Sequence, residues 1–164
     1  MSKVNDIDQL DKQILSILMR NAKKAYTDIA KQLYVSGGTI HVRMKKLEDA
    51  GIVKGYNLVV DHSKLGYDIS AFLGIYLDKS SLYEDVAKEL RAIKEIVGAH
   101  YTTGLYNIFA KIICRDTDHL REVLHQIQEV KGIQRTETFI SLEESINRPL
   151  AIEEEEEDSM KMSS

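Results

Sequence analysis

A stretch of sixteen residues, SGGTIHVRMKKLEDAG at positions 36–51, carries side chains suited to contacts with DNA. At about 3.6 residues per turn, Ile40, Met44 and Leu47 form an apolar seam on one side of a helix, and the polar and basic side chains lie opposite it or on its flanks. Hydroxyl, imidazole and guanidinium groups hydrogen-bond base edges or phosphates, valine contacts the thymine methyl group, and lysine neutralises backbone charge. The candidate DNA-contacting residues are Ser36, Gly38, Thr39, His41, Val42, Arg43, Lys45 and Lys46. A solvated basic side of an ordinary amphipathic helix has the same pattern.

The helix that positions these residues has well-marked ends. Ser36 is a good N-cap, and Gly51 can adopt the left-handed conformation that ends a helix. Upstream, the sequence predicts one helix that is capped by Asp8 and ends near residue 20, and a shorter one that is capped by Thr27 and ends at residue 33. Two short helices joined by a tight turn, the second of them basic, form a helix-turn-helix. A strand-like run over 52–60 follows, of the kind that forms a wing or an interdomain connector.

The length and the charge distribution of the chain favour two small domains. It has 164 residues, 43% of them apolar. Residues 1–60 hold ten Lys/Arg against six Asp/Glu (+4), residues 61–152 hold eleven against fourteen (−3), and residues 153–164 hold one against six (−5). We therefore expect a cationic N-terminal domain and a solvated, disordered acidic end. The expected division is a helix-turn-helix domain at 1–54, a connecting strand and linker at 55–67, a second domain at 68–148 and an acidic tail at 149–164.

Cysteine usage and hydropathy predict a cytoplasmic protein without a membrane partner. Cys114 is the single cysteine and lies in an apolar run, so we expect a core thiol and no intramolecular disulfide. No apolar run approaches the roughly 18–20 residues that span a bilayer, and the N-terminus has no signal-peptide core. The five histidines include no pair at a convincing metal-ligand spacing, and no glycine-rich phosphate loop or nucleophile elbow is present. We expect no catalysis, no metal and no cofactor.

Beyond residue 65 the pattern changes to strands that alternate with helices. The expected elements are a buried strand over 69–77, a helix opened by a Ser81–Glu84 capping box, strands over 97–103 and 107–114, a helix capped by Asp116 and stopped by Gly132, and a strand over 133–142. The order βαββαβ predicts a ferredoxin-like unit, so the whole chain is expected to be an α+β protein. A four-stranded sheet with helices on one face leaves its other face available to a partner.

Six segments of the chain resemble one protein family in order and spacing: LDKQIL, AYTDIAKQL, VSGGTIHVRMKKLEDAGIVKG, LGYDISAFLGIYL, YTTGLYNIFAKIICR and IQRTETFISL. Over roughly residues 6–148 the sequence resembles the Lrp/AsnC, or feast/famine, transcription regulators. The resemblance implies a winged helix-turn-helix that binds double-stranded DNA and a βαββαβ domain that senses an amino acid. In that family the sheets of two protomers pack face to face into a dimer, dimers assemble further, typically into octamers, and effector sites lie between dimers.

The resemblance also implies a ligand site at the turn between the two middle strands. Gly104 lets the backbone approach a small ligand closely, and nearby N–H groups can bind its carboxylate. The implied ligand-binding residues are Tyr101, Thr102, Thr103, Gly104, Tyr106, Asn107, Thr136, Glu137 and Thr138. The segments TIHVR and YTTG resemble the asparagine-responsive branch of the family, so asparagine is the expected effector. Without the resemblance, the alternative is a plain hairpin with hydrogen-bonded threonines.

Four positions depart from the family pattern or need a special role. Tyr34 stands where a turn glycine is usual, and a positive φ there would strain this bulky residue by about 1 kcal/mol or more. Gly37 stands where a proline commonly opens the recognition helix. Asn107 replaces an aspartate that suits an ammonium group. Glu137 could supply that missing negative charge, and the alternative is an ordinary exposed strand residue.

Two other classes of function remain open at this point. One is an architectural DNA-binding protein without an effector. The other is a small-molecule-binding regulatory subunit whose N-terminal helices mediate assembly and do not bind DNA. The basic face over 36–51 favours DNA binding over the second of these classes.

Overall fold

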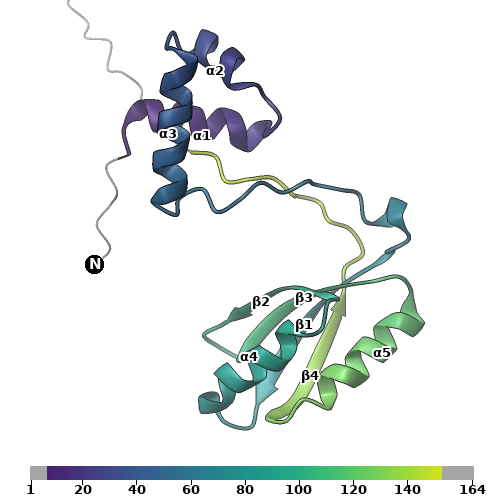
Figure 1. Cartoon of the computed structure of the whole chain (residues 1–164). Coiled ribbons are helices and arrows are strands. Elements are labelled where there is room, and N and C mark those ends of the chain that lie inside the picture. The colour runs from purple at the N-terminus through teal and green to yellow at the C-terminus, as the bar shows by residue number, and fades with distance from the viewer. Residues whose placement is uncertain (1–6, 153–164) are drawn as a thin grey trace, which may run out of the picture. The chain divides into compact units, whose positions relative to one another are not determined.

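The computed structural model of the chain describes residues 7–152 (Figure 1). The described residues form two compact units, residues 7–58 together with 147–152, and residues 59–146. The linker expected over 55–67 is thus divided between the two units. Most of the expected acidic tail lies outside the described residues.

Three helices build the first unit: α1 (Gln9–Arg20), α2 (Tyr26–Gln32) and α3 (Gly37–Asp49). The expected caps of the first and third helices are confirmed. The Asp8 side chain accepts from the backbone N–H of Asp11, and Asp11 in turn accepts from the backbone N–H of Asp8. Ser36 accepts from the N–H of Thr39. The helices enclose a small core made of Ile14, Leu18, Ile29, Ala30, Ile40, Met44 and Leu47.

Two local predictions for this unit are wrong. Thr27 does not cap α2, because the helix begins one residue earlier and follows Ala25, which makes no side-chain cap. The run over 52–60 is not a strand, and within residues 7–152 it pairs with no other strand. The first residues of this run instead close the C-terminal end of α3, because the N–H groups of Ile52 and Val53 both donate to the carbonyl of Leu47. An apolar run predicts a strand only where a neighbouring strand can accept its hydrogen bonds.

The turn between α2 and α3 contains the strained residue that the sequence predicts. Tyr34 has φ 56° and is the single non-glycine residue with positive φ in the described part of the chain. Its side chain is 96% exposed, so no packing compensates the strain. The following residue closes the turn, because the Val35 N–H donates to the carbonyl of Ala30. At the other end of α3, Gly51 has φ 70°, as expected.

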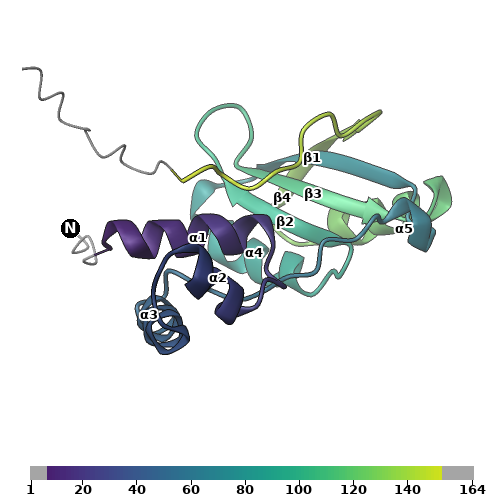
Figure 2. The ribbon, with the colours of Figure 1, turned by 90° about the horizontal axis from the view of Figure 1, so that it is seen from above.

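The second unit is a four-stranded antiparallel sheet with two helices (Figures 1 and 2). Its elements are β1 (Ile69–Leu77), α4 (Tyr83–Arg91), β2 (Ile96–Tyr101), β3 (Ile108–Cys114), α5 (Thr117–Gln128) and β4 (Ile133–Ile140). The strand order β2-β3-β1-β4 confirms the ferredoxin-like βαββαβ unit. The cap at Asp116 is confirmed by its hydrogen bond from the His119 N–H.

Strands β2 and β4 each end two residues before the predicted end, and two helix boundaries also differ from the prediction. A 3₁₀ turn, Ser80–Leu82, takes up the residues of the expected Ser81 cap, and α4 begins at Tyr83 without a side-chain cap. The expected stop at Gly132 comes too late, since α5 ends at Gln128. Gly132, with φ 96°, instead turns the chain into β4.

The core of this unit lies between the two helices and one face of the sheet. Alternate residues of β1 and β3 point into it, together with the apolar sides of α4 and α5, and the fully buried members include Leu73, Ile75, Val86, Ile112, Val123 and Ile127. Cys114 belongs to this core, and burial raises the pKa of its thiol to about 11. The thiol is therefore protonated near neutral pH, as expected for a core cysteine.

Candidate nucleic-acid interface and ligand site

One side of α3 presents polar and small residues to solvent. His41, Val42 and Lys45 are exposed, Val42 by 70% and the Lys45 side chain by 77%. Gly38 is exposed near the start of the same helix. These four predicted residues therefore lie on an accessible surface.

Ser36 and Thr39 form the start of this helix. The Ser36 hydroxyl accepts from the Thr39 N–H at 3.1 Å and hydrogen-bonds the Thr39 hydroxyl at 2.9 Å. Both hydroxyls are thus used to hold the first turn of α3.

The other two predicted basic residues point toward α1. The Arg43 guanidinium pairs with Asp8 and, at 3.3 Å, with Asp11, and the Lys46 ammonium lies 3.2 Å from Asp11. The Asp11 side chain is fully buried, whereas those of Arg43 and Lys46 are 28% and 45% exposed. Lys46 is exposed, as expected for the outer face, but its ammonium is turned toward Asp11 of α1. The four side chains form an ionic cluster that fixes α3 on α1.

The cluster also sets the ionisation of its members. The hydrogen bond from the Asp11 N–H, helped by Arg43, holds the pKa of Asp8 below its usual value. The hydrogen bond to Asp8 raises the pKa of Arg43. All of this favours the charged forms, so the pairing persists at neutral pH.

Tyrosine side chains support the exposed His41. The Tyr26 ring meets the His41 ring edge to face with centroids 4.8 Å apart. The Tyr56 hydroxyl lies 3.4 Å from that of Tyr26 and donates to Glu48 at 3.0 Å. These hydrogen bonds, the one with Tyr26 first, raise the pKa of Tyr56. Tyr56, which follows the helix-turn-helix in the chain, is thereby joined to α2 and α3.

In the second unit, the turn between β2 and β3 is closed by its own threonine. The Thr102 hydroxyl donates to the carbonyl of Tyr106 at 2.7 Å, and the Thr102 N–H donates to the carbonyl of Asn107 at 3.0 Å. Thr103 and Gly104 are exposed at its tip. Gly104 has φ 106°, and a Cβ built there would meet no atom within 4 Å. The backbone at Gly104 is therefore accessible to a small ligand.

The Asn107 side chain is used inside the protein. Its Oδ1 accepts from the Leu77 N–H at 2.9 Å, and its Nδ2 donates to the Ser80 hydroxyl at 3.3 Å. The amide thus joins the end of β1 to the turn before α4. In this arrangement both polar atoms of Asn107 already have partners within the unit.

Tyr106 and Glu137 lie together on the sheet face that the helices do not cover. The Tyr106 hydroxyl donates to Glu137 at 2.8 Å, and Tyr76 and Arg135 donate to the other carboxylate oxygen at 3.2 and 2.7 Å. These hydrogen bonds, that of Tyr106 first, lower the pKa of Glu137. Arg135 compensates its charge and stacks 3.6 Å from the Tyr76 ring centroid. Glu137 is therefore not an uncompensated negative charge that could replace an aspartate at position 107.

The Tyr106 ring lies directly over a glycine of β1. A Cβ built on Gly74 would come within 2.5 Å of the ring carbons Cδ1 and Cε1. Around this ring, the uncovered face carries an aromatic cluster made of Phe72, Tyr76, Tyr106, Phe109 and Phe139.

The remaining predicted ligand residues point the other way. Thr136 and Thr138 stand opposite the core residues Ile75 and Leu73, on the helix side of the sheet. Tyr101 stacks on Tyr83 of α4 with ring centroids 4.3 Å apart. Within one chain, the nine predicted ligand residues are thus divided among the turn, the uncovered face and the helix side.

Both units of the chain are similar to known proteins. Residues 7–54 match the family profile described as winged helix-turn-helix DNA-binding, and residues 70–151 match the Lrp/AsnC ligand binding domain. The chain is 46% identical over 145 residues to the regulatory protein AsnC of Escherichia coli, covering 88% of this chain and 95% of that protein. It is 43% identical over 148 residues to AsnC of Haemophilus influenzae, covering 90% and 99%. The chain belongs to the Lrp/AsnC family.

Two solved structures of transcriptional regulators have the same fold. The structure of E. coli AsnC superposes with a TM-score of 0.83 at 44% sequence identity, covering 88% of this chain and 98% of that one. A Neisseria meningitidis regulator, described as a complex with L-methionine, superposes with a TM-score of 0.80 at 23% identity, covering 86% and 93%. This Lrp/AsnC chain is accordingly a DNA-binding transcriptional regulator with a ligand-binding domain, as the resemblance predicted.

Reading the sequence missed several residues that shape the two surfaces of this Lrp/AsnC protein. Asp8 is predicted as a helix cap and not as a partner of α3, and Asp11 is not among the predicted residues, although two carboxylates three residues apart at the start of one helix are a usable signal. No local sequence pattern indicates that Tyr26 and Tyr56 lie near His41, or that Arg135 pairs with Glu137.

The described residues of this Lrp/AsnC chain contain neither a metal-binding cluster nor a membrane-spanning helix. Among residues 7–152, no three His, Cys, Asp or Glu side chains come together in a way that could hold a metal ion. Within the same part of the chain, every helix is too short or too polar to span a bilayer.

Proposed function

We propose that the protein is a sequence-specific regulator that reads double-stranded DNA with the outer side of α3 and responds to asparagine. The proposal of DNA binding rests on which side chains of α3 are exposed and which are paired with α1. His41, Val42 and Lys45 are exposed, while Arg43 and Lys46 pair with α1 and hold the helix in place. An accessible surface on a helix with a fixed position is what readout of the major groove requires.

For DNA binding, Lys45 and Lys46 should behave differently although they are neighbours. Lys45→Ala should weaken binding to all sequences alike and lower the slope of log affinity against log salt by about 0.9, because it removes one phosphate contact. Lys46→Ala should instead act mainly through the stability of the first unit, since it removes a partner of buried Asp11. Fluorescence anisotropy at several salt concentrations, on a site selected from a random library, measures both.

Lys131→Ala is the matched control, because it removes the same charge from an exposed position in the second unit. It should leave the salt slope unchanged. If Lys45→Ala also left the salt slope unchanged, the assignment of α3 to the DNA interface would be wrong.

The effector half of the proposal rests on the turn at Gly104. The exposed glycine leaves room for a ligand backbone, and the turn is held in shape by Thr102. The L-methionine complex of the Neisseria regulator supports an amino acid as the effector class. A site that hydrogen-bonds a side-chain amide should prefer asparagine first and glutamine second, and should reject leucine by about 1–3 kcal/mol per unpaired group.

Gly104→Val should abolish the response to asparagine and leave DNA binding largely intact. The added side chain occupies the space that the ligand needs, and valine is strained at φ 106°. Titration calorimetry with asparagine, glutamine and leucine measures the effect. Gly66→Val is the control, because Gly66 has φ 81° and equally open surroundings elsewhere in this unit. Tighter binding of leucine than of asparagine, or an unchanged response in Gly104→Val, would contradict the assignment.

We also infer that two chains associate through the uncovered face of the sheet and that such dimers form a higher oligomer, with the octamer expected. The support is the aromatic cluster on that face, where Phe139 is 45% exposed in a single chain. In a face-to-face dimer this cluster would be buried. The proposal includes a cytoplasmic location and no enzymatic activity, in keeping with the buried Cys114 thiol. Sedimentation of the full chain tests the oligomeric state.

A further inference from the structure

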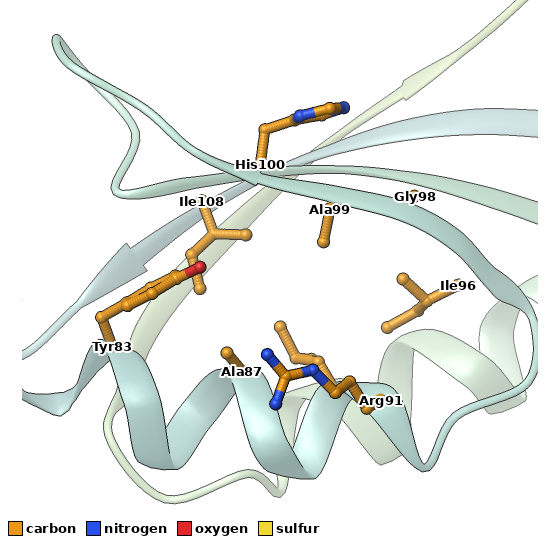
Figure 3. A pocket seen from close by; sticks show the side chains of 9 residues that line it. Tyr83, Ala87, Arg91, Ile96, Gly98, Ala99, His100 and Ile108 are labelled. Carbon is orange, nitrogen blue, oxygen red and sulfur yellow. The ribbon is translucent and has the colours of Figure 1, made fainter. Parts of the chain in front are cut away.

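A cavity of about 250 Å³ lies between α4 and the edge strand β2 (Figure 3). Its walls come from α4, β2 and the start of β3, and its lining residues are Tyr83, Ala87, Leu90, Arg91, Ile96, Gly98, Ala99, His100 and Ile108. At about 30 Å³ per water molecule this space equals roughly eight waters. That is the size of a small metabolite and less than a drug-sized ligand occupies.

The cavity combines apolar walls with one cation. Ala87, Ile96 and Ala99 face the space from its two sides, and the Arg91 side chain extends from the last residue of α4 back along the helix toward Ala87, where it lines the space (Figure 3). The His100 ring points away from it on the other side of the strand. No ion pair or side-chain hydrogen bond joins Arg91 to any residue in the described range 7–152. The Arg91 guanidinium could donate two parallel hydrogen bonds to one carboxylate, and the apolar wall beside it offers no such acceptor.

The lining also excludes one ligand class. It contains no aspartate or glutamate, so the ammonium group of an amino acid would be partly desolvated there without a charged partner. A carboxylate, by contrast, can bind Arg91, and an alkyl tail can displace water from the apolar walls. The Tyr83 hydroxyl, which is directed toward the space in Figure 3, offers one further hydrogen bond.

We propose that this cavity is a second small-molecule site, separate from the turn at Gly104, which binds an apolar monocarboxylate with about six carbons in all and no α-ammonium group. Arg91 binds the carboxylate, and Ala87, Ile96 and Ala99 enclose the tail. Its ligand class differs from that of the proposed effector site, because the cavity selects against the ammonium group that every free amino acid carries.

Titration calorimetry of the full chain with three matched compounds tests the proposal. Isocaproate should bind. Isocaproamide, which has the same shape without the charge, and leucine, which has the same carbon skeleton plus an ammonium, should each bind roughly tenfold more weakly or worse. Equal affinity for isocaproate and its amide, or no binding of isocaproate at millimolar concentration, would overturn it.

Variants of the chain locate the binding. Arg91→Met keeps the apolar stem and should weaken isocaproate by roughly tenfold. Arg121→Met, the same change on the exposed side of α5, should have no effect. Ala87→Leu should abolish binding by filling the cavity while α4 stays helical, which circular dichroism checks. Gly104→Val should leave isocaproate affinity unchanged, so failure of this inference and failure of the asparagine site remain distinguishable. Full isocaproate affinity in both Arg91→Met and Ala87→Leu would refute the site.

Discussion

Replacing Asp11 by alanine should destabilise the first unit by about 2–4 kcal/mol. The fully buried carboxylate pairs with Arg43 and Lys46 and completes the capping box of α1 with Asp8. Loss of one partner from a buried ion pair costs about 3–5 kcal/mol, and we reduce this because both cations are partly exposed and can be rehydrated. Loss of the cap adds up to about 1 kcal/mol. Hydrogen exchange of peptides from α1 and α3, followed through a urea series, measures the change in the unit concerned.

Asp28→Ala is the matched control for this experiment. Asp28 is an exposed aspartate on α2 whose pairing with Lys31 is long, at 4.0 Å, so its removal should cost no more than about 0.5 kcal/mol. A triple variant that replaces Asp11, Arg43 and Lys46 by apolar residues of similar size should recover much of the lost stability, since no charge is left unpaired. A loss below 1 kcal/mol for Asp11→Ala would show that the cluster does not hold α3 in place.

The second large effect is expected for Gly74→Ala. The new methyl group would come within 2.5 Å of the Tyr106 ring, and β1 cannot yield because Gly74 is paired with Phe109 on one side and Glu137 on the other. Tyr106 must therefore leave its position and lose its 2.8 Å hydrogen bond to Glu137. Overpacking of about 1–3 kcal/mol plus about 1 kcal/mol for the hydrogen bond gives a loss of about 2–4 kcal/mol.

A double-mutant cycle separates this clash from a general effect on the strand. In a Tyr106→Ala background, Gly74→Ala should cost less than about 1 kcal/mol, because the ring that it meets is absent. Gly98→Ala, on the edge strand β2 and with no atom within 4 Å of the added carbon, should change stability by no more than about 0.5 kcal/mol. Urea unfolding of the second unit provides the measurement. Additive costs in the cycle would contradict the packing of Tyr106 on Gly74.

The fold could be predicted largely because its signals are local. Asp8, Ser36 and Asp116 each stand before an apolar helical period, and each proves to be the cap. Thr27 and Ser81 have the same side-chain chemistry but lie inside a helical turn or a 3₁₀ turn, where a hydroxyl no longer faces the free N–H groups. Side-chain type therefore indicates where a helix can begin, and the path of the preceding chain decides where it does.

The site was predicted less completely because its partners are distant in sequence. Helical periodicity gives the angular position of Arg43 and Lys46 but not the buried Asp11, which is 32 and 35 residues away. In the same way, the sequence places Asn107 beside the turn without showing that Leu77 and Ser80 occupy its amide group. Such contacts follow from tertiary packing, which no local pattern reports.

The ionic cluster between α1 and α3 has a consequence for how the protein finds its sites. With Arg43 and Lys46 paired to α1, Lys45 is the one basic residue of α3 that makes no pair with α1, so α3 has few cations with which to displace counterions. A single unit should thus hold DNA weakly at cellular salt. In the dimer that we propose, two such units would act on the same duplex at an effective concentration that can reach the millimolar range. Occupancy then depends on the distance between two short half-sites along the helix, and a change in that distance should matter as much as a change in their bases.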